Sequence, residues 1–181
     1  MKATGIVRRV DDLGRVVVPK EIRKTLKIRE GDPVEIFTDR EGQIILKKYS
    51  PIGEMVDFAK IYAESMSKIA GHRVIVTDRE KIIAVAGGVR KEYLERNISK
   101  EVEHIMENRS AVDSGKTKKL FPVVDGEEPM AQQQIVYPIL CDGDVIGSII
   151  MLSNEKSNGL CETENKIAGV AAAFLGRQME G

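Results

Sequence analysis

The sequence predicts an α+β protein with two domains: a small, β-rich N-terminal domain and a larger antiparallel sheet with flanking helices. Residues 1–50 contain short apolar runs separated by turn residues, whereas residues 54–179 alternate helical stripes with hairpin patterns. The formal charge changes sign at the same place: residues 1–50 carry twelve Lys/Arg against eight Asp/Glu, and the rest carries sixteen against twenty. A basic domain joined to an acidic one suggests that the basic domain meets a polyanion.

Four short strands and one short helix are expected in the N-terminal domain. Residues 5–10 and 16–18 are apolar runs typical of strands, and residues 11–14 supply turn chemistry between them. A helix is predicted over residues 20–27, because a proline precedes it and apolar side chains recur four positions apart. Residues 33–48 carry an alternating apolar pattern interrupted by a glycine turn, which predicts a hairpin.

The N-terminal domain is too small to be stable alone. A unit of about fifty residues buries too little apolar surface to fold without disulfides, a metal or a partner chain. Residues 1–50 contain no cysteine and no histidine, so self-association is the remaining source of stability. The sequence therefore predicts a dimer through this domain.

Residues 54–179 predict a second domain after a linker at residues 50–53. In chain order we expect a helix at 55–70, a hairpin of strands 73–77 and 82–86, a helix at 91–108, an extended or mobile loop at 109–131, a hairpin of strands 134–140 and 145–152, and a helix at 162–179. An antiparallel sheet covered by helices is the economical packing for this order. The two terminal helices are expected to lie together. Four small residues of the last helix would permit close helix approach: Gly169, Ala172, Ala173 and Gly176.

Neither a metal site nor catalytic chemistry is evident in the sequence. Cys141 and Cys161 belong to no close-spaced ligand set, and His72 and His104 are far apart without obvious partners. No nucleophile triad, paired-carboxylate motif or phosphate loop is present. We therefore expect no cofactor, no metal and no enzymatic activity.

The sequence also predicts where the protein resides. No apolar run is long enough to span a membrane, and the charged N-terminus lacks the apolar core of a signal peptide. We expect a cytoplasmic protein that associates with the nucleoid and has no membrane partner.

Four segments of the N-terminal domain carry a specific resemblance. They are Thr4-Gly-Ile-Val-Arg-Arg-Val, Asp12-Leu-Gly-Arg-Val-Val-Val-Pro19, Glu21-Ile-Arg-Lys-Thr-Leu26 and Ile45-Leu-Lys-Lys-Tyr49. In order and spacing they closely resemble the AbrB-type swapped-hairpin DNA-binding domains, over about residues 1–50. In that family two chains interleave their hairpins into one small β-barrel. The resemblance thus implies an interleaved dimer that binds double-stranded DNA.

The resemblance also implies which side chains contact DNA. The family's contacting positions fall on Arg8, Arg15, Arg23 and Lys24. Lys24 stands where some relatives carry Arg, so it supplies a point charge without the fork geometry of a guanidinium. Further phosphate contacts are expected, with less support, from Lys2, Arg9, Lys20 and Lys27. No helix presents a row of base-reading side chains, which favours shape and backbone readout and degenerate target sequences.

Joined to the second domain, this pattern is similar to a family of sporulation-stage transcription regulators that act as activators and repressors. That similarity implies that residues 54–179 form a GAF-like sensor or oligomerisation domain. An unidentified small molecule is one candidate ligand, bound between the sheet and residues 91–131; a purely oligomerising domain is the equal alternative. Self-association through the terminal helices would join two dimers into a tetramer.

Two other classes of protein are weighed against a transcription regulator. An enzyme is disfavoured because the Gly87-Gly88 pair and the Asp142-Gly143-Asp144 turn are explained as backbone turns. An antitoxin is the second alternative, because some swapped-hairpin proteins neutralise toxins with a short C-terminal tail. Such tails are disordered when free, whereas residues 51–181 carry periodic apolar elements and are expected to fold.

Overall fold

The structure, a computed structural model, describes residues 4–50, 52, 56–154 and 159–180 of the 181-residue chain. The chain divides into two compact units, Met1–Tyr49 and Ser50–Gly181. Helices and antiparallel strands occur in both, which confirms the predicted α+β class.

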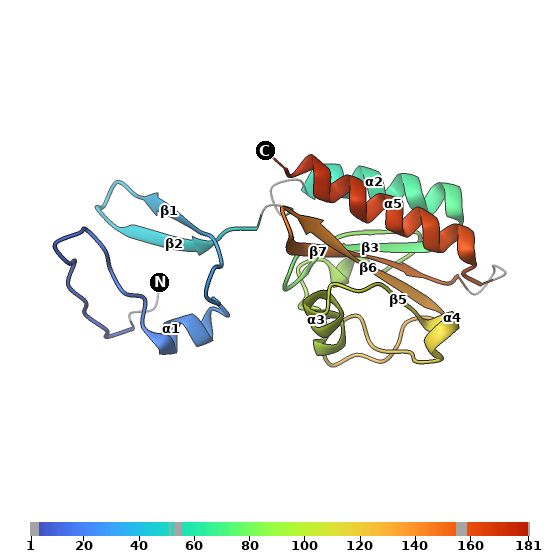
Figure 1. Cartoon of the computed structure of the whole chain (residues 1–181), viewed down its shortest axis with the longest axis horizontal. Helices are drawn as coiled ribbons and strands as arrows, with labels where there is room; N and C mark the ends of the chain where they lie inside the picture. The colour runs from blue at the N-terminus through green and yellow to red at the C-terminus, as the bar shows by residue number, and fades with distance from the viewer. Residues whose placement is uncertain (1–3, 51, 53–55, 155–158, 181) are drawn as a thin grey trace. The chain divides into compact units, whose positions relative to one another are not determined.

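Within its described residues, the first unit forms one short helix and one hairpin (Figure 1). These are α1 (Lys20–Thr25), β1 (Val34–Thr38) and β2 (Ile44–Lys48). The two strands pair antiparallel from Val34 opposite Lys48 to Thr38 opposite Ile44. The hairpin predicted over residues 33–48 is therefore confirmed, and the helix predicted over residues 20–27 is present in a shorter form.

The end of α1 is set by a tight cap. Lys27 adopts a left-handed conformation, with φ of 50°. The amide of Ile28 donates to the carbonyl of Arg23 at 2.8 Å, and the amide of Lys27 donates to the carbonyl of Lys24 at 3.2 Å. This pair of bonds is a Schellman motif, which satisfies the last carbonyls of the helix and turns the chain away.

The strands predicted at residues 5–10 and 16–18 are absent from the structure of the single chain. The turn between them is present, and the amide of Asp11 donates to the carbonyl of Arg15 at 3.0 Å. A strand requires a partner ladder, and residues 4–19 have none within the described part of this chain. The strand prediction for residues 5–10 and 16–18 therefore does not hold in the structure of one chain.

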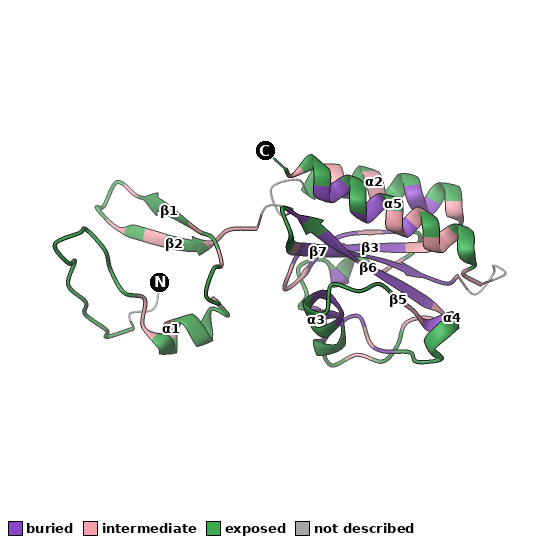
Figure 2. Cartoon of the chain, viewed as in Figure 1, coloured by how far each residue is buried: buried purple, intermediate pink, exposed green. Residues whose placement is uncertain are grey.

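Burial distinguishes the first unit from the second (Figure 2). None of the described residues 4–49 is buried. Several large apolar side chains stand in water, with exposed fractions from 36% to 85%; they are Ile6, Val7, Val10, Leu13, Val16, Val17, Leu26, Ile36, Phe37, Ile44 and Leu46. Leaving so much apolar surface in water is unfavourable, so this unit lacks a core of its own.

The second unit is a five-stranded antiparallel sheet in the order β4-β3-β7-β6-β5. Its elements are α2 (Val56–Ala70), β3 (Arg73–Thr77), β4 (Ile82–Ala86), η2 (Lys91–Tyr93), α3 (Lys100–Glu107), β5 (Val112–Asp113), α4 (Ser114–Thr117), β6 (Gln134–Cys141), β7 (Asp144–Leu152) and α5 (Glu162–Gln178). Helices α2 and α5 lie side by side on one face, and α3 lies on the other (Figure 1). Alternate residues of the strands therefore enter two separate apolar cores.

The two terminal helices meet through aromatic rings. Phe174 of α5 stacks on Tyr62 and Phe58 of α2, with ring centroids 5.5 and 6.1 Å apart. The prediction that these helices lie together is confirmed. Gly169 and Gly176, by contrast, face strand β6, where an added Cβ would stand 3.1 Å from the Tyr137 ring and 1.9 Å from the Leu140 carbonyl oxygen. These glycines allow α5 to approach the sheet closely, so the prediction that they serve helix–helix contact is wrong.

A single helix over residues 91–108 was expected, and the structure contains η2 and α3 instead. Between them, Glu95 has a positive φ of 65°. Its amide donates to the carbonyl of Ile82 at 2.9 Å, and the amide of Ile82 donates to the carbonyl of Arg96 at 3.0 Å. These bonds to the edge of β4 replace helical ones, and α3 starts afresh where Ser99 caps the amide of Val102 at 3.2 Å.

Residues 109–131, expected to form an extended or mobile loop, are packed against the domain. It contains β5 and α4, and Phe121, Val123 and Val124 are buried in the core beneath the sheet. The predicted linker at residues 50–53 also differs. Ile52 is 1% exposed within the core of the second unit, because burying an isoleucine side chain is favourable. Pro51, Gly53 and Met55 lie outside the described residues.

No helix in the described part of the chain is both long enough and apolar enough to cross a membrane.

Candidate nucleic-acid interface

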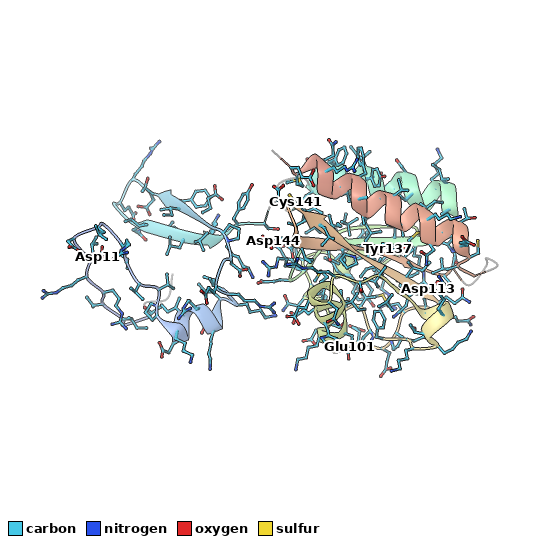
Figure 3. All side chains as sticks on the ribbon, viewed as in Figure 1. Asp11, Glu101, Asp113, Tyr137, Cys141 and Asp144 are labelled. Atoms are coloured by element: carbon cyan, nitrogen blue, oxygen red, sulfur yellow. The ribbon has the colours of Figure 1, made fainter. Side chains whose placement is uncertain are left out.

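The first loop of the N-terminal unit is organised by Asp11 (Figure 3). Its carboxylate Oδ1 accepts the amides of Leu13 at 3.0 Å and Arg15 at 2.8 Å. Its own carbonyl accepts the amide of Gly14 at 3.0 Å. Gly14 has a φ of 74°, which glycine adopts without strain. The residues 11–15 thus form a closed turn of the kind that joins hairpin strands.

The Arg15 side chain is held by the same aspartate. Its Nε donates to Asp11 Oδ2 at 2.8 Å, and the Arg15 side chain is 69% exposed. The hydrogen bonds from Arg15, backbone first and then side chain, hold the pKa of Asp11 below its usual value. Asp11 therefore stays ionised, and the guanidinium is anchored at one nitrogen while the rest faces solvent.

Arg23 and Lys24 are neighbours on α1. The helix begins after Pro19, whose carbonyl accepts the amide of Arg23 at 2.9 Å. Both basic side chains are exposed, and neither takes part in an ion pair with any described residue. Two unneutralised cations in the last turn of a helix are stabilised by its dipole and remain available to an anionic partner.

Arg8 lies on the extended segment that enters the first loop. It is exposed, and its guanidinium Nη1 donates only to the neighbouring carbonyl of Val7, at 3.2 Å. Arg9, Lys20 and Lys27 are exposed as well, whereas Lys2 lies outside the described residues. The four predicted contact residues thus occupy an extended arm, a turn and a helix, and all present cationic side chains to solvent.

Asp11 was recognised in the sequence only as a turn former. Its pairing with Arg15 could have been predicted from their spacing, because an Asp can pair with an Arg four residues later across a glycine turn. A second residue was missed entirely. Gln134 is 0% exposed, and neither Oε1 nor Nε2 of its side chain has a hydrogen-bond partner among the described residues.

Gln134 belongs to the face of the sheet that α3 covers. It pairs with Leu152, and Leu152 and the alternate residue Val136 both lie in that core. Its backbone amide donates to Ser114 Oγ at 2.8 Å. An unpaired amide in an apolar core costs about 1–3 kcal/mol, which marks this point as one that a polar ligand would stabilise.

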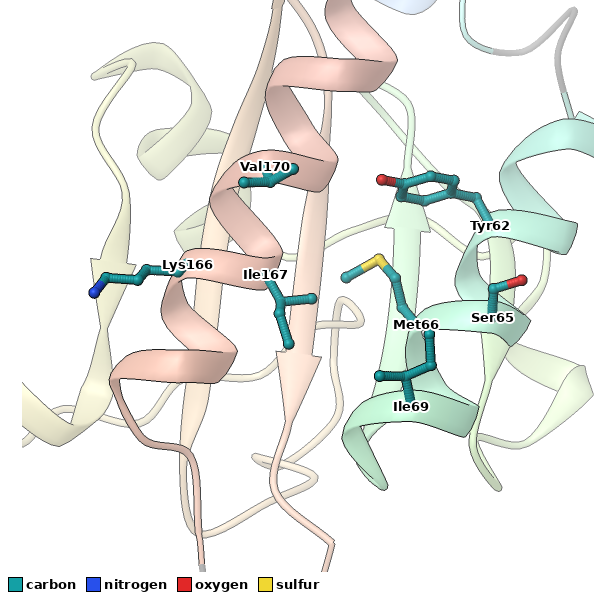
Figure 4. Close-up of a pocket in the computed structure, with 7 residues that line it drawn as sticks. All are labelled: Tyr62, Ser65, Met66, Ile69, Lys166, Ile167 and Val170. Carbon is teal, nitrogen blue, oxygen red and sulfur yellow. The ribbon is translucent and has the colours of Figure 1, made fainter.

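The opposite face of the second unit carries an apolar groove between α2 and α5 (Figure 4). Its volume is about 380 Å³, and it is lined by Tyr62, Ser65, Met66, Ile69, Lys166, Ile167 and Val170. Ile69 and Val170 are 81% and 66% exposed. Burial raises the pKa of Tyr62 above its usual value. The groove therefore presents apolar side chains on two packed helices.

The thiols and histidines form no ligand set. Cys141 is buried, while Cys161 is exposed at the start of α5. Among the described residues, no three His, Cys, Asp or Glu side chains are grouped so as to hold a metal ion.

Comparison with known proteins places both units. A family model described as stage V sporulation protein T C-terminal, transcription factor, matches residues 54–180. A second model, described as antidote-toxin recognition MazE, bacterial antitoxin, matches residues 7–54. Stage V sporulation protein T of Bacillus subtilis (strain 168) is 51% identical over 180 residues, which cover 99% of each chain.

Two further similarities concern one unit each. The transition state regulatory protein AbrB of Bacillus subtilis (strain 168) is 45% identical over 86 residues, covering 46% of this chain and 88% of that protein. The solved GAF domain of an Acinetobacter phosphoenolpyruvate-protein phosphotransferase aligns with a TM-score of 0.55 at 14% identity, covering 69% of this chain and 81% of that one. The GAF-like fold predicted for the second domain is thereby confirmed.

Proposed function

Because the chain belongs to the stage V sporulation protein T family of transcription factors, we propose that it regulates sporulation-stage genes, as activator and repressor, by binding double-stranded DNA through residues 1–50. Residues 54–179 then form the regulatory domain. The observation that carries this proposal is that the first unit exposes several cationic side chains on a segment similar in sequence to AbrB. Counterion release from the DNA phosphates drives such binding.

The DNA-binding form is an interleaved dimer of the N-terminal units. None of the described residues 4–49 is buried in one chain, although eleven large apolar side chains are available there. A second copy supplies strand partners for residues 5–10 and 16–18 and covers this apolar surface. The dimer also doubles the number of basic side chains on one surface.

Arg8, Arg15, Arg23 and Lys24 are the proposed DNA contacts. None of the four is buried, and only Arg15 pairs with an acidic side chain among the described residues. Binding should therefore weaken steeply as salt rises. Residues 4–49, the described part of the first unit, contain no helix of eight or more residues, which favours readout of DNA shape and backbone over a base code.

Fluorescence anisotropy across a salt series tests these contacts. Arg8→Ala, Arg15→Ala, Arg23→Ala and Lys24→Ala are each expected to weaken binding by about tenfold or more, since an arginine contact contributes about 1–3 kcal/mol. Loss of a phosphate contact should also lower the slope of log affinity against log salt by about 1.

Lys100→Ala provides the control, because Lys100 is an exposed cation at the start of α3 in the second unit. It should bind DNA as the wild type does. If the four variants fold normally and also bind as the wild type does, the proposed site is wrong. If the wild type binds no duplex at any salt concentration, the proposed function itself fails.

The second unit is proposed to join two such dimers into a tetramer. Its groove between α2 and α5 exposes Ile69 and Val170. Phe174 of α5, outside the groove lining, is 40% exposed. A second copy of the same two helices would cover these side chains and form a four-helix contact. Two linked DNA-binding dimers raise the effective concentration at paired sites, by about a hundredfold or more where the geometry allows.

A small-molecule ligand is proposed for the opposite face, between the sheet and residues 91–131. The support is the unpartnered amide of Gln134, which offers one donor and one acceptor edge within an apolar core. Such a group fits an uncharged planar ligand that carries its own amide or carbonyl. The ligand would regulate DNA binding only by favouring one arrangement of the chain over another.

We further propose that the chain is cytoplasmic, associates with the nucleoid and has no catalytic role. Membership in a transcription-factor family supports this assignment. An antitoxin with a short tail is disfavoured, because a folded sheet and helices follow the N-terminal unit.

A further inference from the structure

We propose that Asp11 is a positioning residue for DNA binding, which fixes the Arg15 guanidinium before DNA arrives. This inference rests on the proposed role of Arg15 as a DNA contact. Asp11 carries a negative charge on a surface proposed to meet phosphates, so on charge alone it opposes binding. Its position is explained if ordering the Arg15 side chain strengthens DNA binding by more than the repulsion between Asp11 and the phosphates weakens it.

The geometry is local and closed. The Asp11 amide donates to the Arg15 carbonyl at 3.0 Å, and the Arg15 amide donates to Asp11 Oδ1 at 2.8 Å. The Arg15 Nε donates to Asp11 Oδ2, also at 2.8 Å. All of these lie within five residues of sequence. The arrangement therefore requires no contact with the second unit or a second chain, and dimer formation leaves it intact.

The pairing leaves the useful part of the guanidinium open. An arginine has five N–H donors, and Asp11 takes one of them, at Nε. Among the described residues, nothing accepts from the other four, which lie on Nη1 and Nη2. These four form the fork that bridges two acceptors on phosphate or guanine. The bond from Nε to Asp11 thus fixes the orientation of the guanidinium while leaving its Nη1 and Nη2 donors available to DNA.

Ordering the Arg15 side chain before DNA binds should have a measurable effect on affinity. Ordering a long, flexible side chain on binding costs about a three- to tenfold loss of affinity per side chain. A dimer presents two copies of Arg15, so the effect is multiplied. Removing one negative charge per chain gains less, because exposed charges are screened at physiological salt.

The second loop of the same unit is a natural control. Asp39 Oδ1 accepts the amides of Glu41 and Gln43, both at 2.9 Å. The amide of Asp39 donates to the carbonyl of Gln43 at 3.1 Å, and the amide of Gly42 donates to the carbonyl of Asp39 at 3.3 Å. This is the backbone pattern of the Asp11 turn, with an uncharged glutamine in the position of Arg15.

The decisive variants are Asp11→Asn and Asp39→Asn. Asparagine keeps Oδ1 and so preserves either turn, and each substitution removes one negative charge. Binding is measured by anisotropy on a duplex that the wild type selects from random DNA, and on a random duplex. Asp39→Asn should bind as tightly as the wild type or tighter. Asp11→Asn should lose about tenfold or more on the selected duplex, and thermal unfolding of both should match the wild type.

A double-mutant cycle separates this inference from the proposed site. In an Arg15→Ala background, Asp11→Asn should cause no further loss, because nothing remains to be positioned. If Arg15→Ala weakens binding but Asp11→Asn behaves as Asp39→Asn does, the positioning role is overturned while the DNA site stands. If Arg15→Ala itself has no effect, the failure lies in the proposed function.

Discussion

Two neighbouring glutamines of the second unit differ in whether their side-chain amides are hydrogen-bonded. Gln133 and Gln134 are neighbours with opposite environments. Gln133 Oε1 accepts the amide of Leu160 at 2.6 Å and so anchors the chain before α5. Gln134 lies one residue further, on β6, with its side-chain amide unpartnered in an apolar core. The proposed ligand site rests on this unpartnered side chain.

Replacing Gln134 should reveal that cost. Gln134→Met keeps the length of the side chain and removes the unsatisfied amide, so the free energy of unfolding without ligand should rise by about 1–2 kcal/mol. Gln133→Met is the matched control, and loss of its bond to Leu160 should lower the free energy of unfolding by about 1 kcal/mol. Denaturant unfolding of both variants measures this. A loss of stability in Gln134→Met would show that the amide is already satisfied.

Among the elements, α5 is fixed to the sheet by close backbone approach and by polar bonds. Gly176 brings the helix against the Leu140 carbonyl, where a Cβ would stand 1.9 Å from the oxygen. Tyr137 donates its hydroxyl to Asn165 Oδ1 at 2.5 Å, and Asn165 Nδ2 donates to Asp113 Oδ2 at 3.1 Å. These bonds join β6, α5 and β5. The helix that carries the exposed groove is thus held rigidly from beneath.

Gly176→Ala should therefore destabilise the second unit. Alanine is favoured over glycine in a helix by about 1 kcal/mol, but the clash is with backbone and cannot be relieved by a rotamer change. Overpacking of this kind costs about 1–3 kcal/mol, so we expect a net loss. Ala173→Ser, at an exposed position of the same helix, should change the free energy of unfolding by less than about 0.5 kcal/mol. Equal thermal stability of Gly176→Ala and wild type would contradict the observed packing.

At the scale of the whole molecule, the two units differ in how complete they are. The second unit has two cores of its own, one on each face of its sheet. The first has none, since no described residue among 4–49 is buried. Assembly is therefore required for the first unit to be stable. For the second unit, the proposed assembly would only add a contact to a fold that is already formed.

Charges placed in the groove should separate these two assemblies. Ile69→Asp combined with Val170→Asp introduces carboxylates at positions that are 81% and 66% exposed in one chain. The monomer should fold normally, but burying these charges against a second copy is costly. Light scattering should then give the mass of a dimer in place of a tetramer. Lys100→Asp, on the far side of the sheet, should leave the mass unchanged; a wild type that is dimeric at every concentration would contradict the tetramer.

Much of the secondary structure could be predicted from sequence because its causes are local. Strands β3 and β4 occupy the predicted residues 73–77 and 82–86, since strong apolar runs flank a turn with Asp78. The prediction of a single helix over 91–108 was wrong because residues between η2 and α3 make backbone hydrogen bonds to the edge of β4. The apolar periodicity of the sequence does not reveal this partner. The strands expected at 5–10 and 16–18 are absent for a related reason, since the described part of one chain offers them no strand to pair with.

By itself, the sequence determined the two-domain α+β division, the hairpin turns, the basic N-terminal motif and the need of a small domain for a partner. These follow from short-range spacing, turn chemistry and the scaling of surface with size. Only the tertiary structure decided that Asp11 holds Arg15 at Nε, that Gln134 lies unpartnered in a core, and that Gly176 meets a strand instead of a helix. Those facts depend on side-chain direction and distance, which the order of residues does not specify until the chain is folded.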